Sequence, residues 1–167
     1  MYGISRRRAL LGAIVAIGLG GCGFRLRGSR PLPFASVFIT GPVSGELPRL
    51  MRRRIEASGS TRVIDSRSEA ETVLELLSAG REKNIIGLSG SGKVREYEFR
   101  QGLRFRLLGA NGKELIPETV LATTREATWD DSAILAKEQE EALLYADMEQ
   151  ELVRQMMRRL EAAAPGS

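Results

Sequence analysis

A strict alternation of apolar and charged residues over 96–107 is the clearest pattern in the chain. Tyr97, Phe99, Leu103, Phe105 and Leu107 fall on one face of an extended backbone, and glutamates and arginines fall on the other. Because successive side chains of a strand point to opposite faces, this period of two predicts a half-buried antiparallel strand. Shorter apolar runs predict further strands at 35–40, 71–89 and 115–128, with a short extended piece at 61–66.

Two other segments carry apolar residues at spacings of three and four, which predicts helices over 44–59 and 132–162. The longer segment has Tyr145, Met148 and Leu152 on its stripe, and Ser132 stands where a side chain can cap its start. The predicted fold class is α+β, with two helices packed on one face of a roughly four-stranded, largely antiparallel sheet. We expect a bulge near 79–80 and a bend at Gly102.

The N-terminal residues have the pattern of a targeting segment. Three arginines at 6–8 precede an apolar run of about a dozen residues, which is typical of a signal peptide and short for a membrane span. The run ends "LGGC", which resembles the acylation motif of bacterial lipoproteins and makes Cys22 the candidate lipidation site. A diacylglycerol and an N-acyl chain on Cys22 would anchor the protein stably. A buried thiol and a membrane helix over 9–20 are the alternatives.

These features predict the domain organisation. Residues 1–21 form the signal peptide, 22–34 a lipidated tether, 35–163 a single α+β domain and 164–167 a short tail. Gly23, where lipoproteins retained at the inner membrane often carry aspartate, favours the outer membrane as destination, with the domain facing the periplasm. The general secretory route and the twin-arginine route both remain open.

Charge and composition narrow the function classes. The full chain has 25 Lys+Arg, 21 Asp+Glu and no histidine, and the predicted signal peptide removes three arginines and no acid. The mature chain is then nearly neutral, which argues against a nucleic-acid partner, although "RLMRRR" at 49–54 and "KVREYEFRQGLRFR" at 93–106 remain locally basic. Without histidine or a second cysteine, the common nucleophilic triads and zinc sites are excluded. We therefore expect no enzyme activity, no catalytic residues and no metal site.

The stretch "GLSGSGKV" at 87–94 nearly matches a phosphate-binding loop. Val94 replaces the hydroxyl residue that would hold Mg²⁺, and an alternating strand follows where the motif requires a helix. The sequence therefore predicts a flexible turn with Lys93 near its tip and no bound nucleotide.

Several segments together resemble the LptE family of lipopolysaccharide-assembly lipoproteins. These are "GCGFRLRG" after the acylation motif, "KVREYEFRQGLRFRL" as a central strand, and "LAKEQEEALLYADMEQELVRQMMRRL" as a long final helix. The resemblance implies an outer-membrane lipoprotein that plugs and helps assemble an LptD-like β-barrel and binds lipopolysaccharide. It implies that Lys137, in "LAK", binds lipopolysaccharide together with a cation of the central hairpin, either Lys93 or Arg95.

Other interpretations remain. The chain could be a different lipid-anchored adaptor, such as an auxiliary subunit of an envelope lipid transporter. The charged face of the central strand could be a solvated surface or a platform for an anionic amphiphile, with Arg95, Arg100, Arg104 and Arg106 meeting phosphates. Lys137 could simply offset Glu141, four residues further along a solvated helix face.

Overall fold

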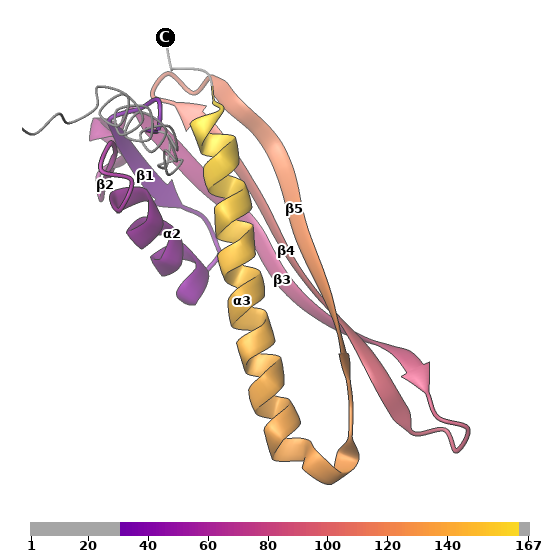
Figure 1. The fold of residues 1–167 in the computed structure, drawn as a ribbon. Coiled ribbons are helices and arrows are strands. Elements are labelled where there is room, and N and C mark those ends of the chain that lie inside the picture. The colour runs from indigo at the N-terminus through magenta and orange to yellow at the C-terminus, as the bar shows by residue number, and fades with distance from the viewer. Residues whose placement is uncertain (1–30, 164–167) are drawn as a thin grey trace, which may run out of the picture.

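A computed structural model describes residues 31–163 of the 167-residue chain. Cys22, the predicted signal peptide at 1–21 and the predicted tail at 164–167 lie outside the described residues. The described residues form an elongated α+β fold in which long strands and one long helix run side by side (Figure 1).

Five strands, two α-helices and two short 3₁₀ turns make up the described chain. In order they are β1 (Ser36–Thr40), α2 (Glu46–Glu56), β2 (Arg62–Ile64), η1 (Arg67–Glu69), β3 (Thr72–Leu88), β4 (Val94–Gly109), β5 (Glu114–Thr128), η2 (Asp131–Ala133) and α3 (Ile134–Glu161). Strands β3, β4 and β5 have 17, 16 and 15 residues. At about 3.3 Å per residue they are each roughly 50 Å long.

The sheet has five strands in the order β2-β1-β3-β4-β5 and is mixed, which corrects the prediction of a roughly four-stranded, largely antiparallel sheet. Strand β1 pairs in parallel with both β2 and β3, whereas β3–β4 and β4–β5 are antiparallel. The parallel pair β1–β2 arises because α2 carries the chain back to the starting edge, as a crossover connection must. The extended piece at 61–66 is thus a true strand.

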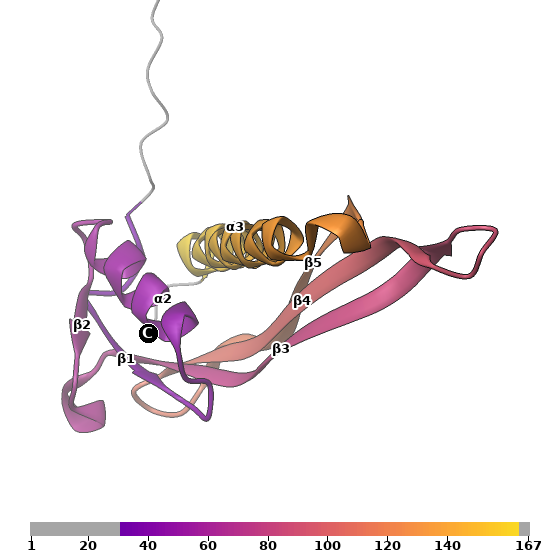
Figure 2. The ribbon, with the colours of Figure 1, turned by 90° about the horizontal axis from the view of Figure 1, so that it is seen from below.

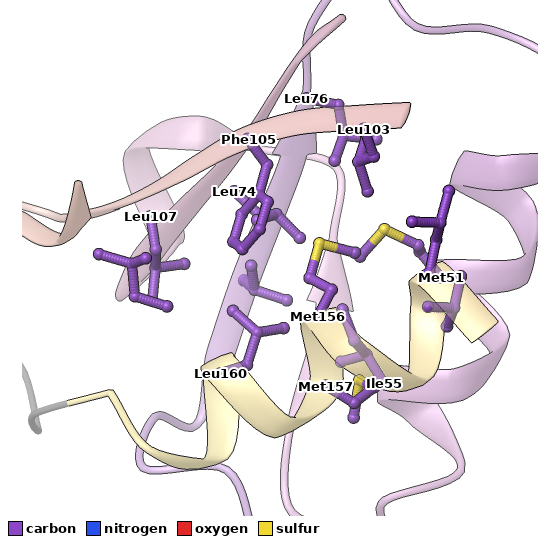
Figure 3. Close-up of a cluster of buried hydrophobic side chains, with 14 of the residues drawn as sticks. Met51, Ile55, Leu74, Leu76, Leu103, Phe105, Leu107, Met156, Met157 and Leu160 are labelled. Atoms are coloured by element: carbon purple, nitrogen blue, oxygen red, sulfur yellow. The ribbon is translucent and has the colours of Figure 1, made fainter. Parts of the chain in front are cut away.

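Both helices pack on the same face of the sheet, as predicted (Figure 2). Their apolar side chains meet the inward face of β1, β3 and β4 in one core, part of which Figure 3 shows around Met51, Phe105 and Met156. The inward residues of β4 are those that the alternation predicted, since Phe99, Leu103, Phe105 and Leu107 are all buried. Burial of an aromatic or aliphatic side chain contributes about 1.5–3 kcal/mol each, so this face holds the helices in place.

The packed domain begins before residue 35, the predicted boundary with the tether. Leu32 and Phe34 are buried in the main core. The Leu32 amide donates to Ser60 Oγ at 2.9 Å, and Thr61 Oγ1 donates to the Phe34 carbonyl at 2.7 Å. Residues 32–34 are therefore part of the fold.

Pairing of β3 with β4 shifts register between Leu76 and Ser78, close to the bulge predicted near 79–80, and again between Ile85 and Leu88. Gly80 and Gly102 stand directly opposite each other in regular register, so no bulge occurs at Gly102. The start of α3 is capped through η2, where the Asp130 carboxylate accepts from the Ser132 amide at 2.9 Å. Asp130 therefore takes the capping role that the sequence assigned to Ser132.

Candidate functional site

The candidate ligand-binding cations lie toward one end of the molecule, which we call the distal end. It comprises the β3–β4 turn at 89–93, the segment 128–133 that follows β5, and the first turns of α3. The β3–β4 hairpin projects past the start of α3, and both views place this end opposite to the end where α2 and α3 terminate (Figures 1 and 2).

Lys137 lies in the second turn of α3, and its side chain is only 18% exposed. Its ammonium group donates to Glu140 Oε2 at 2.7 Å and to Thr128 Oγ1 at 3.5 Å. The proposed pairing with Glu141 is wrong, because the Glu141 carboxylate accepts instead from Lys83 at 2.6 Å. Lys137 is therefore held between Glu140 and the end of β5.

Arg95 and Lys137 both contact the chain at the end of β5. The Arg95 carbonyl accepts from the Trp129 amide at 2.8 Å, which fixes the start of β4 beside the segment that leads into α3. Hydrogen bonds from the backbone and side chain of Ser132 hold the pKa of Asp130 below its ordinary value, and the charges of Arg95 and Lys137 add to this lowering. The backbone of Arg95 and the ammonium group of Lys137 thus contact two successive residues, Trp129 and Thr128.

Lys93 occupies a different position, in the turn at the tip of the hairpin. Its carbonyl accepts from the Ser89 amide at 2.7 Å, and Gly92 adopts φ +82°, which closes the turn. Strand β4 starts at Val94, so a strand follows Lys93, as the sequence predicted. Within residues 31–163 Lys93 makes no ion pair, and it contacts neither Thr128 nor Trp129 by a hydrogen bond. Arg95 is therefore the hairpin cation that lies with Lys137.

Exposed apolar side chains accompany these cations at the distal end. Leu88 at the end of β3 is 62% exposed and Leu135 in the first turn of α3 is 76% exposed, and Ile85, Ile86 and Ile134 are also exposed. A surface that combines cations with several apolar side chains suits an amphiphile that carries phosphates and acyl chains.

An aromatic box around Lys83 was not predicted from the sequence. The Lys83 ammonium lies 4.2 Å from the ring centre of Trp129 and 4.3 Å from that of Tyr97, in addition to its ion pair with Glu141. The Tyr97 and Trp129 rings meet edge to face at 5.1 Å. This box ties β3, β4, the end of β5 and α3 together behind the Arg95–Lys137 site. The alternating strand signalled Tyr97, but nothing local in "REKN" distinguishes Lys83 from a solvated lysine.

A second group of polar contacts joins α3 to the sheet beside the Lys83 box. The Arg81 guanidinium lies 4.6 Å from the Tyr145 ring centre and donates to Glu149 Oε1 at 2.7 Å, and the buried Gln101 donates to the same oxygen at 3.3 Å. Burial raises the pKa of Tyr145, with the charge of Glu141 acting in the same direction. The distal half of the helix–sheet contact is therefore polar and aromatic, unlike the apolar core around Met156.

The outward face of β4 is extensively ion-paired. Arg106 donates to Glu75 Oε2 at 2.7 Å, and Arg104 lies 3.2 Å from Glu118. These pairs favour the interpretation of a solvated, charge-balanced face over that of a phosphate platform for these two arginines.

Between residues 31 and 163, no three Cys, Asp or Glu side chains converge to form a cation site. No helix in the same range has the length and hydropathy to cross a membrane.

The chain is similar to proteins of lipopolysaccharide assembly. A family described as "LptE: Lipopolysaccharide-assembly" matches residues 34–160. Two relatives named "LPS-assembly lipoprotein LptE" each span 90% of this chain and 82% of their own length, that of Pectobacterium atrosepticum at 28% identity and that of Photorhabdus laumondii at 25%.

Solved structures show the same fold. The solution structure of lipoprotein B from Nitrosomonas europaea is 36% identical, with a TM-score of 0.72 over 84% of this chain and 91% of that one. The crystal structure of rare lipoprotein B from Shewanella oneidensis has a TM-score of 0.64 at 24% identity, covering 76% of this chain and 96% of that one. With the family match extending from β1 to the end of α3, the chain belongs to the LptE family of lipopolysaccharide-assembly proteins.

Proposed function

We propose that this chain is a lipid-anchored subunit of an outer-membrane lipopolysaccharide translocon, in which it plugs and helps assemble an LptD-like β-barrel and binds lipopolysaccharide. Family membership supports the role in lipopolysaccharide assembly. The anchor is the acylated Cys22, and the chain acts by binding and positioning, without catalysis or a cofactor beyond its own lipid.

The observation that carries the ligand site is the contact of Arg95 with Trp129 and of Lys137 with Thr128, beside exposed apolar side chains. Phosphate groups accept charge-assisted hydrogen bonds from guanidinium and ammonium groups, and each such bond contributes about 1.5–3 kcal/mol before solvent screening. Acyl chains would contact Leu88, Ile134 and Leu135. Lys93, at the projecting tip, reaches only a ligand that extends past the hairpin and has a smaller part in binding.

The elongated shape of the domain supports the proposed role as a plug inside the barrel. Three strands of roughly 50 Å and the 28-residue α3 form an elongated body that a wide barrel lumen can enclose lengthwise (Figure 1). Isolation of the tagged full chain from its native membrane tests this role. Recovery of a β-barrel protein together with the chain is the expected result, and recovery of a transporter without any barrel would favour a different adaptor.

The ligand site is tested by binding purified lipopolysaccharide to the full chain and to two charge reversals, Arg95→Asp and Lys137→Asp. Each should weaken binding by about tenfold or more, because a cation is replaced by a repelling carboxylate. Lys113→Asp, in the exposed β4–β5 turn at the other end, makes the same change in charge and should bind like the wild type. Equal affinity of all three folded variants, checked by circular dichroism, would refute the site.

The anchor has a separate test. Mass spectrometry of the membrane-extracted protein should find Cys22 as the first residue, carrying a thioether-linked diacylglycerol and an N-acyl chain. An intact residue 1 or an unmodified Cys22 would contradict it.

A further inference from the structure

A groove lined by arginines lies at the end of the molecule opposite to the distal site. It has a volume of about 330 Å³ and runs between the C-terminal ends of α2 and α3. Arg54 of α2 faces Arg154 and Arg158 of α3 across it, Ala57, Ser58 and Met157 complete much of the lining, and Glu161 is its one carboxylate. We call this the arginine groove. Arg54 is the last residue of "RLMRRR", a motif that the distal site leaves unused.

The guanidinium groups of the groove are only partly neutralised. Among residues 31–163 Arg54 makes no ion pair. Arg154 and Arg158 share one carboxylate, that of Glu151, which receives Arg154 Nη2 at 2.8 Å and Arg158 Nη2 at 3.5 Å. Glu151 lies outside the groove lining, so it holds Arg154 and Arg158 in place without occupying the groove. Three arginines against one lining carboxylate leave a positive site with donors from both helices.

The groove also adjoins the point where the described chain begins. The Leu32 amide donates to Ser60 Oγ at 2.9 Å, and Ser60 Oγ lies 3.2 Å from Ser58 Oγ, a residue of the groove lining. Leu32 lies ten positions after Cys22 in the chain. At no more than about 3.5 Å per residue they span at most roughly 35 Å, so an acylated Cys22 keeps this end of the domain close to the surface that holds the anchor.

We propose that the arginine groove binds the phosphate headgroup of an anionic phospholipid in the leaflet that carries the lipid anchor. Guanidinium groups match phosphate oxygens in a planar, two-donor geometry, and three of them here come from two rigid helices. A glycerophosphate headgroup fits a groove of about 330 Å³, in which a lone phosphate would leave most of the space unfilled. The closeness of the groove to the membrane depends on the proposed acylation of Cys22, whereas the charge and lining of the groove do not.

The molecule would then contact two different lipids, one at each end. The distal site takes the transported lipopolysaccharide, and the arginine groove takes a membrane phospholipid. Bound headgroup and lipid anchor together would fix the orientation of the long axis relative to the membrane, since either contact alone permits rotation.

The test measures lipid retention by native mass spectrometry on the full chain purified in a non-ionic detergent. The probes are phosphatidylglycerol, a diacylglycerol with the same acyl chains and no phosphate, and inorganic phosphate. Arg54→Gln/Arg158→Gln removes two groove cations and keeps the Arg154–Glu151 pair. Arg62→Gln/Arg159→Gln removes two exposed arginines outside the groove and is the matched control.

The wild type and the control should retain phosphatidylglycerol equally, and the groove variant should retain about tenfold less. None should retain diacylglycerol. Equal retention by the groove variant and the control would overturn the proposal, as would binding of inorganic phosphate as tight as that of the lipid, which would make the groove a site for the free anion. Lipopolysaccharide binding by the groove variant should stay at the wild-type level, so failure here and failure of the distal site are distinguishable.

Discussion

Replacement of Lys83 by methionine should lower the free energy of unfolding by about 2 kcal/mol. The Lys83 ammonium lies over Tyr97 and Trp129 at 4.3 and 4.2 Å and pairs with Glu141 at 2.6 Å. Cation–π contacts contribute about 0.5–1 kcal/mol at exposed sites and about 2 kcal/mol when desolvated, and Lys83 is intermediate at 29% exposure. The ion pair adds at most about 1 kcal/mol because Glu141 is still 25% exposed. Methionine retains the packing of the lysine stem and loses only the charge.

Urea titration followed by circular dichroism measures this change, with Lys113→Met in the exposed β4–β5 turn as the matched control, expected within about 0.5 kcal/mol of the wild type. A double-mutant cycle with Glu141→Gln isolates the ion pair, whose coupling should be about 0.5–1 kcal/mol. The loss should be local, with faster hydrogen exchange in the first half of α3 and in the distal part of β3. If Lys83→Met and Lys113→Met are indistinguishable in both measurements, the aromatic box does not hold the helix to the sheet.

Three further predictions concern the fold. Gly41→Ala should lower the free energy of unfolding by about 3 kcal/mol in urea titration, because φ is +127° and the new Cβ would lie 2.1 Å from a backbone oxygen of β3. Gly90→Ala, with no atom within 4 Å of the new Cβ, should lower it by less than about 0.5 kcal/mol, and equal losses in the two variants would contradict this prediction. Met156→Ala should lower the free energy of unfolding by about 2–5 kcal/mol, because Met156 is fully buried in the core. Leu143→Ala, at a residue 72% exposed, should leave it nearly unchanged, as measured by thermal unfolding. Because the pKa of Asp130 is lowered, its carboxylate stabilises the start of α3 above its ordinary pKa of 3.8, and this effect is lost as the pH falls through the lower folded value. The protection of amides there, measured relative to the intrinsic exchange rate at each pH, should therefore fall in acid, and Asp130→Ala should show the lower protection already at pH 7.

The sequence predicted those elements whose pattern is long and local. The 96–107 alternation and the stripe through Met148, Leu152 and Met156 each repeat over several periods. Such long patterns determine the type of element largely independently of the neighbours it packs against. Strand β2 has only three residues, too few to show a period, and its parallel pairing is decided by the path of α2. The number and direction of the strands were therefore the part of the fold most open to error.

Part of the candidate site could be predicted from the sequence, and part could not. Lys137 was found because "LAK" resembles a family motif, and Arg95 was one of two neighbouring candidates for the hairpin cation. The structure places both against the end of β5, at Thr128 and Trp129. The Lys83 box could not be predicted, since its rings come from residues 14 and 46 positions away in the chain. Sequence alone carries no signal for which of many lysines a distant aromatic residue will cover.

The mixed pairing of the sheet has a consequence for the order of folding. The hairpins β3–β4 and β4–β5 close at Leu88–Val94 and Leu108–Glu114, each six residues apart, whereas the parallel contact of Val37 with Thr72 joins residues 35 apart. Closing the longer loop costs about 1.6 kcal/mol more in chain entropy, and that cost precedes any gain from pairing. We therefore expect the three long strands and α3 to assemble first, with β1 and β2 joining last. Pulse-labelled hydrogen exchange during refolding should protect β4 amides before those of β1, so that the segment nearest Cys22 remains the last part of the chain to become fixed.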